Sequence, residues 1–178
     1  MKLSNKKSGF TLAEVLVTLM IIGVIAAMTI PSLMQSTAQQ EYKAAFKKAV
    51  SMLNQAVTLN YALDGEDGSN FTGASFFNLL TKRLNVMSSV SGQKELYTAD
   101  GMWFKATDTN KHAFNANADN VNAPANVCGS VIIDVNGQKG PNKFTTDTNK
   151  VFDMFTVSIY PQKALPADQT MAKALYAK

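Results

Sequence analysis

The dominant pattern of the chain is an apolar run of 21 residues from Phe10 to Ile30. About 20 apolar residues in a helix are enough to cross the hydrocarbon of a bilayer. The nine residues before this run are mostly polar and include three lysines: Lys2, Lys6 and Lys7. Basic residues beside a membrane helix favour the cytoplasmic side. The pattern predicts a single-pass helix with a cytoplasmic N-terminus and the rest of the chain outside.

Beyond Pro31 the apolar residues recur at steps of three and four: Tyr42, Phe46, Ala49, Val50, Leu53, Val57 and Tyr61. This spacing predicts an amphipathic helix with one face packed on a globular head. Turn-forming residues from Asp64 to Ser69 end the helix near Leu63. A helix from Phe10 to Leu63 would be about 80 Å long at 1.5 Å per residue. That is more than the head needs, so lipid or other copies of the chain must bury its N-terminal half.

Pro31 lies inside this long helix, eight residues after Gly23. Proline removes an amide donor and clashes with the carbonyl of the preceding turn, so we expect a kink or a local break. One interpretation is a tolerated kink in a membrane helix. The other is that the segment from Gly23 to Pro31 is weak enough to stretch or melt in a fibre.

The remaining residues predict a small head of mixed structure. Ser75 is a candidate N-cap of a short helix over 76–84, and Asp100-Gly101 is a hairpin signal between two short strands. Strands are expected over 96–97, 102–104, 127–135 and 152–160, the last ended by Pro161 and Pro166. A surface loop is expected over 107–126 and a C-terminal helix over 169–177. These elements predict an α+β fold, with one long helix packed against a small antiparallel sheet.

The basic character of the chain comes largely from its N-terminus. The chain has 17 basic and 13 acidic residues. Without the first nine residues, 14 basic and 13 acidic residues remain, a net charge near +1. The lysines therefore indicate membrane topology, and we predict no nucleic-acid surface.

Glu14 is the one carboxylate in the apolar run. A charge inside lipid costs about 2.5 to 3.5 kcal/mol or more, so we expect Glu14 to have a function. A cut after Gly9 would give Phe10 a new α-ammonium, and the apolar helix would be retained, unlike a secretory signal peptide. One turn of helix separates the two charges in one chain, whereas neighbouring chains staggered along an axis can pair them. This arrangement predicts a filament.

The stretch from Gly9 to Glu14, followed by an apolar helix and Pro31, resembles the N-terminal signature of type IV pilins and type II secretion pseudopilins. The resemblance is close over about the first 35 residues. It implies that a prepilin peptidase cuts after Gly9 and methylates Phe10. It also implies that Phe10, Glu14 and Pro31 serve in assembly.

The resemblance implies a pilin-like fold with four parts: a cleaved leader (1–9), a transmembrane half-helix (10–30), an amphipathic half-helix (31–63) and a globular head (64–178). It implies a structural subunit rather than an enzyme. The expected partners are membrane lipid, the peptidase, an inner-membrane assembly platform and other subunits of a periplasmic or extracellular filament. The alternative is a minor tip subunit that captures DNA, a surface or a secreted substrate. The N-terminus does not separate pilus, secretion and competence machinery.

The segment 134–142 is the most distinctive part of the head. It is typical of a hairpin loop in which Asn-Gly takes positive φ and Asp134 and Asn142 bond to the loop backbone. The alternative is a calcium loop, since some pseudopilins bind calcium in a C-terminal loop. Its candidate oxygen ligands are Asp134, Asn136, Asp147 and Asp153. The spacing is not that of an EF-hand, and no other cofactor is expected.

Four further features carry simple expectations. Cys128 is the only cysteine. It is either a small buried residue or half of an interchain bridge. Many members of the resembled family close this region with an internal disulfide, which this chain cannot form. His112 is expected in solvent, with no catalytic partner. Trp103 is expected in the core, although an exposed Trp103 would be a ligand platform. Lys43, Lys47 and Lys48 form a solvated helix face or pair with acidic groups on a neighbouring subunit.

Overall fold

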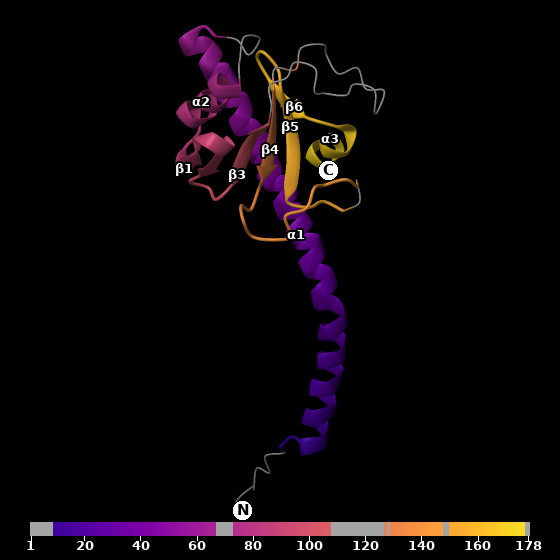
Figure 1. Cartoon of the computed structure of the whole chain (residues 1–178). Helices are drawn as coiled ribbons and strands as arrows, with labels where there is room; N and C mark the ends of the chain where they lie inside the picture. The colour runs from indigo at the N-terminus through magenta and orange to yellow at the C-terminus, as the bar shows by residue number, and fades with distance from the viewer. Residues whose placement is uncertain (1–8, 67–72, 108–126, 128, 148–149, 177–178) are drawn as a thin grey trace, which may run out of the picture. The chain divides into compact units, whose positions relative to one another are not determined.

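The computed structural model describes residues 9–66, 73–107, 127, 129–147 and 150–176. The chain divides into two compact units, residues 1–38 and 39–178, which are described separately below. The helix α1, Leu12–Asp64, contributes residues to both units (Figure 1).

The first unit is helical from Leu12 onward. Pro31 lies inside α1 and the helix continues through it, so the expected local break does not occur. The polar hydroxyls of this segment bond to their own helix: Thr18 Oγ1 donates to Val15 O (2.9 Å) and Thr29 Oγ1 donates to Ile25 O (3.0 Å). Hydroxyls satisfied in this way suit a helix that meets lipid.

The second unit contains a six-stranded sheet in the order β1-β2-β3-β4-β5-β6. Every neighbouring pair is antiparallel, so the sheet is a simple meander. The strands are β1 Val86–Val90, β2 Glu95–Thr98, β3 Trp103–Thr107, β4 Gly129–Asp134, β5 Met154–Ile159 and β6 Ala164–Pro166. This arrangement confirms the predicted α+β fold, a long helix against an antiparallel sheet.

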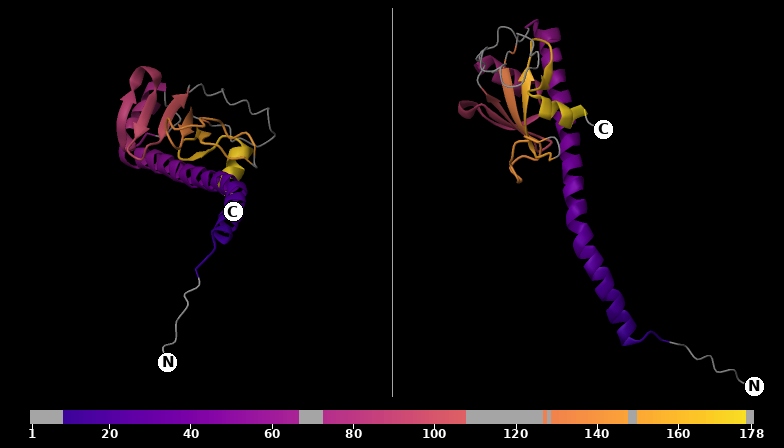
Figure 2. Two further views of the ribbon diagram at one scale, coloured as in Figure 1. Left: turned by 90° about the horizontal axis from the view of Figure 1, so that it is seen from below. Right: turned by 90° about the vertical axis from the view of Figure 1, so that its right-hand side faces the viewer.

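Residues 39–64 of α1 pack on this sheet together with α2, Gly73–Arg83, and α3, Gln169–Tyr176 (Figure 2). The inward-facing row of the sheet is fully buried and runs in register through Leu96, Phe104, Ile133 and Phe155. Phe46 of α1 stacks on Phe155 with ring centroids 4.0 Å apart. The predicted stripe of α1 thus faces the core from Phe46 to Val57, but Tyr61, its last predicted member, is exposed.

Asn54 of α1 joins the helix to the edge strand β6. Its Nδ2 donates to Ala164 O (2.9 Å) and its Oδ1 accepts from Ala164 N (2.8 Å). The amide thus satisfies both main-chain groups of Ala164, as a neighbouring strand would. Asn54 lies off the apolar stripe in the sequence, so the periodicity of the helix gave no indication of this contact.

Two predicted boundaries are wrong. The helix α2 begins at Gly73, so Ser75 lies inside it and is not its N-cap. Pro166 was expected to lie beyond the last strand, but it is the final residue of β6. Proline is tolerated there because an edge strand has one side without a partner strand. The sequence also did not predict β1, whose residues are mostly exposed and do not alternate between apolar and polar.

The Asp100-Gly101 hairpin is confirmed. Gly101 has φ +83, its amide donates to Thr98 O (3.0 Å), and Thr98 N donates to Met102 O (2.9 Å). The predicted strands near 127–135 and 152–160 correspond to β4 and β5, and the C-terminal helix corresponds to α3. Most of the expected surface loop, together with His112 and Cys128, lies outside the described residues.

Candidate functional site

The N-terminal end of α1 is closed by Thr11 and Glu14. Thr11 N donates to Glu14 Oε2 (2.8 Å), and Thr11 Oγ1 donates to the same oxygen (2.9 Å). Glu14 N in turn donates to Thr11 Oγ1 (3.2 Å). This reciprocal pattern is a capping box, which satisfies amides that have no partner within the first turn of a helix.

The capping box corrects one expectation. The sequence interpretation left the Glu14 carboxylate without any partner until another chain docked. The structure gives it two hydrogen bonds within its own chain, both to Oε2. The signal was present in the sequence, because Thr11-Leu12-Ala13-Glu14 has the spacing of a capping box.

Gly9 and Phe10 precede α1 and are not helical. The Phe10 side chain is 91% exposed, and no atom lies within 4 Å of a Cβ built on Gly9. The large apolar side chains that follow are also exposed: Leu12, Val15, Leu16, Val17, Leu19, Met20, Ile21, Ile22, Val24, Ile25, Met28, Ile30, Leu33 and Met34. Exposed apolar surface on this scale requires burial by something outside the chain.

A family model for the prokaryotic N-terminal methylation motif matches residues 4–30. This segment is the prepilin signature of type IV pilins and pseudopilins. The motif implies a pilin-like substrate of prepilin peptidase, and a structural subunit that assembles with other pilin subunits. No curated protein and no solved structure matches the chain.

Among the described residues, one helix, α1, is long and apolar enough to cross a membrane. Its apolar segment lies near the N-terminus and is not buried within the chain. These properties are consistent with a membrane anchor.

The second candidate site is the segment 134–142, which joins β4 to the residues before β5. Asp134 Oδ1 accepts from Asn136 N (3.2 Å), and Gly137 takes φ +70. Asp153 Oδ2 accepts from Asn142 N (2.8 Å) and its Oδ1 accepts from Lys143 N (2.9 Å). The segment is therefore a loop held by carboxylate-to-backbone bonds. The bond to Asp134 confirms that part of the hairpin interpretation, whereas the two bonds to Asp153 were not predicted.

Asp134 is 4% exposed, and burial raises the pKa of its carboxyl group to about 6. Hydrogen bonds from the backbone amides of Asn136 and Gly137 oppose this shift, and the nearby Asp153 charge adds to it. The pKa of Tyr42 on α1 is also raised, first by burial and then by the charge of Asp153, while the nearby Asn136 side chain opposes this rise. The loop thus contacts the long helix through Asn136 and Tyr42.

The candidate calcium ligands are only partly brought together. Asp134 and Asp153 are near enough for their charges to interact, and Asp147 is an exposed residue whose backbone pairs with Lys150. Within the part of the chain that the structure describes, no group of three or more His, Cys, Asp or Glu side chains could hold a metal ion. Calcium binding by Asp134, Asn136, Asp147 and Asp153 stays a prediction.

The expectation that Trp103 lies in the core is wrong. Its neighbour Phe104 points into the core and is fully buried, so Trp103 points to the opposite face of the sheet and is half-buried. The alternation of a strand explains the difference, because only every second residue faces the helix. Lys48 pairs within the chain, with its Nζ 3.1 Å from Asp100 in the first hairpin.

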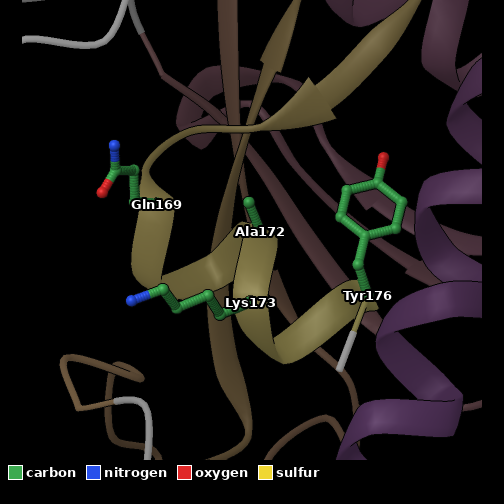
Figure 3. Close-up of a pocket in the computed structure, with 4 residues that line it drawn as sticks. All are labelled: Gln169, Ala172, Lys173 and Tyr176. Carbon is green, nitrogen blue, oxygen red and sulfur yellow. The ribbon is translucent and has the colours of Figure 1, made fainter. Parts of the chain in front are cut away.

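The outer surface of α3 carries a shallow depression lined by Gln169, Ala172, Lys173 and Tyr176 (Figure 3). Gln169 and Lys173 extend to one side of the helix and the Tyr176 ring lies on the other. Their polar groups do not converge on a common point, so this depression has no feature of a specific binding site.

Proposed function

We propose that this chain is a structural subunit of a filament of the type IV pilus or type II secretion kind. The observation that carries the proposal is the methylation motif over residues 4–30 on a helix whose apolar side chains are exposed. Prepilin peptidase cuts after Gly9 and methylates Phe10. The proposed role as a filament subunit is the same whether the filament belongs to a pilus, to a secretion system or to competence machinery.

Before assembly the protein waits as a single-pass anchor in the inner membrane, with lipid around the apolar half of α1 and the head outside the cytoplasm. The three leader lysines support this orientation. The internal bonds of Thr18 and Thr29 reduce the polar surface that α1 presents to lipid. The capping box does the same for Glu14, because it gives the carboxylate partners within the helix.

During assembly the Glu14 carboxylate pairs with the α-ammonium of Phe10 in another subunit. Both bonds from Thr11 go to Oε2, so pairing at Oε1 leaves the capping box intact. Removing one partner of a buried ion pair costs about 3 to 5 kcal/mol, because the other charge stays uncompensated. The pair therefore sets the axial register of the filament.

The experiment compares two substitutions at Glu14 in cells that assemble the filament. Glu14→Gln keeps an oxygen that can complete the capping box but removes the charge. Glu14→Ala removes both. If charge pairing drives assembly, both variants are cleaved and both fail to enter filaments. Normal incorporation of Glu14→Gln would show that capping alone suffices and would overturn the pairing mechanism.

A minor, tip-located subunit is the second candidate function. The observation that favours it is the aromatic surface on the outer face of the sheet, where Trp103 is half-buried rather than packed in the core. Quantitative immunoblotting of purified filaments distinguishes the two functions. A major subunit is abundant along the fibre, whereas a tip subunit is present at a few copies per filament.

Calcium binding in the head remains a separate proposal. Support comes from the proximity of Asp134 and Asp153. A ligand that binds only the folded state raises the midpoint of thermal unfolding as its concentration rises. Calcium titration at neutral pH tests this, with Asp153→Asn as the variant that loses the response. An unchanged midpoint in the wild-type protein would rule the site out.

A further inference from the structure

Four side chains form a row across the outer face of the sheet. Tyr97 on β2 lies directly opposite Trp103 on β3, Trp103 lies opposite Asp134 on β4, and Asp134 lies opposite Met154 on β5. Residues directly opposite in an antiparallel sheet have Cβ atoms about 5 Å apart. The row therefore places two aromatic side chains next to each other, with a carboxyl group at their side.

This row lines a cavity of about 270 Å³. The polar groups that join it are Glu95, Gln138 and Asn142. Gln138 Nε2 donates to the hydroxyl of Tyr97 (2.9 Å), which links the 134–142 loop to the aromatic pair. Ligand sites combine apolar walls with a few convergent polar groups in this way, and the volume lies just below their usual range of about 300 to 1,000 Å³. It suits a single ring rather than a long chain.

The charges around the cavity restrict the chemistry of its ligand. The carboxyl groups of Glu95 and Asp134 oppose a phosphate, so a nucleic acid is disfavoured. Glu95 is already paired with Lys105, whose Nζ lies 2.8 Å from Oε1, and the lysine opposes a cationic ligand. A neutral ligand with many hydroxyl groups meets neither obstacle, because carboxylate and amide groups both bond to hydroxyls.

We propose that Tyr97 and Trp103 form the platform of a sugar-binding site on the outer face of the head. The face of an aromatic ring is negative, and the C–H groups on one side of a pyranose ring are slightly positive, so the two stack. Glu95, Gln138 and Asn142 line the same cavity and carry groups that can accept or donate hydrogen bonds at the edge of that ring. The shared chemistry is a pyranose with equatorial hydroxyls, from a surface polysaccharide or from a glycosylated protein.

This proposal goes beyond filament assembly and does not depend on it. The site lies on strands β2 to β5 and the 134–142 loop, whereas assembly rests on residues 9–31. Failure of one leaves the other intact, since sugar binding is measured on the isolated protein and incorporation is measured in cells. A sugar-binding head would also give either a major or a tip subunit a means of attachment.

The test uses the mature full-length chain in a sugar-free detergent. Trp103 is the only tryptophan, so its fluorescence reports this site alone. We expect cellobiose or N,N′-diacetylchitobiose to change the emission in a saturable manner, with a Kd on the order of 1 mM, equivalent to about −4 kcal/mol. Mannitol, an open-chain polyol without a pyranose ring, should leave the emission unchanged. Defined polysaccharides and a glycosylated protein then distinguish the two sources.

Variants are compared by calorimetric titration, which does not require the tryptophan. Trp103→Ala and Gln138→Ala should each weaken binding at least about fivefold. Gln138 is exposed, so its replacement leaves the fold intact even if Trp103→Ala does not fold. Tyr176→Ala on α3 removes an exposed aromatic group elsewhere and should bind as the wild type does.

Three results would overturn the proposal. The first is the absence of saturable binding of both disaccharides at concentrations of roughly 10 mM, well above the expected Kd. The second is wild-type affinity in Gln138→Ala. The third is binding of single-stranded oligothymidylate at this site in place of sugar, which would make the platform a nucleic-acid surface.

Discussion

Gly137 lies directly against the backbone of Gly101, because a Cβ built on Gly137 would be 2.6 Å from the Gly101 carbonyl oxygen. Two turns meet at this point, the 98–101 hairpin and the 134–142 loop. Gly137 also has φ +70, a conformation that side chains disfavour. Glycine is therefore required here for both its backbone freedom and its lack of a side chain.

Gly137→Ala should lower the free energy of unfolding by more than about 2 kcal/mol, because strain and a backbone clash add. Gly101→Ala has the positive φ but open space around its Cβ, so about 1 kcal/mol is expected. Gly92→Ala has neither problem and should stay within about 0.5 kcal/mol of the wild type. Urea unfolding of the three variants gives the order, and equal losses at Gly137 and Gly101 would contradict the clash.

Asp134 should make the head less stable as pH rises from about 4 to about 6. In the unfolded chain its carboxyl group loses its proton near pH 3.8, whereas in the fold burial holds the pKa at about 6. The native state binds the extra proton in this window, so the free energy of unfolding falls as pH rises. The stabilisation of the native state by the protonated Asp134 is fully lost above pH 6, and it amounts to at most about 3 kcal/mol.

Asp134→Asn isolates this effect, because its carbonyl oxygen can still accept from Asn136 N. We expect a flatter stability profile between pH 4 and 6 and a more stable head at pH 7 to 8, measured by thermal unfolding across that range. An unchanged slope in the variant would assign the pH dependence to other groups. Calcium is omitted from these buffers, so the carboxyl groups are compared without the ion.

Asn54→Ala should destabilise the head by about 2 to 4 kcal/mol. The substitution leaves the Ala164 amide and carbonyl without their shared partner, and each unsatisfied buried group costs about 1 to 3 kcal/mol. Gln55→Ala is the matched control, since Gln55 is exposed and bonds weakly to Ser51 (3.4 Å). Chemical unfolding compares the two, and similar losses would show that Asn54 acts only through helix propensity.

Processing at Gly9 should leave Phe10 as the first residue, with one added methyl group. Mass spectrometry of the N-terminal peptide from filaments or membranes provides the measurement. Gly9→Val is expected to block the cut, because it places a branched side chain at the residue before the cleaved bond. The fold should not change, since no atom lies within 4 Å of a Cβ built on Gly9. A native product that retains its first nine residues would contradict the whole assignment of the N-terminus.

The sequence predicted those features that depend on local pattern. The apolar run, the stripe of α1 and the Asp100-Gly101 turn each depend on periodicity or on the φ preference of glycine. Contacts between distant segments were missed, such as Asn54 with Ala164, which are 110 positions apart. The face on which Trp103 lies depends on strand register, and short strands in this sequence do not determine register.

The candidate site was predicted unevenly for the same reason. Glu14 was found because a carboxylate in an apolar run stands out, but its bond to Thr11 was overlooked although the spacing was visible. The pairing of Tyr97 with Trp103 needs the hairpin register, and the cavity beside them needs the position of the 134–142 loop. Neither can be deduced from one strand at a time.

The bond between Asn54 and Ala164 has a consequence for polymerisation. An uncovered sheet edge can recruit strands from other molecules and nucleate amyloid-like aggregation. At β6 the helix amide already occupies the outward main-chain groups of Ala164. Neighbouring heads therefore cannot pair through main-chain hydrogen bonds at that residue. Ordered assembly of the filament then proceeds without competition from aggregation at this point of the sheet edge.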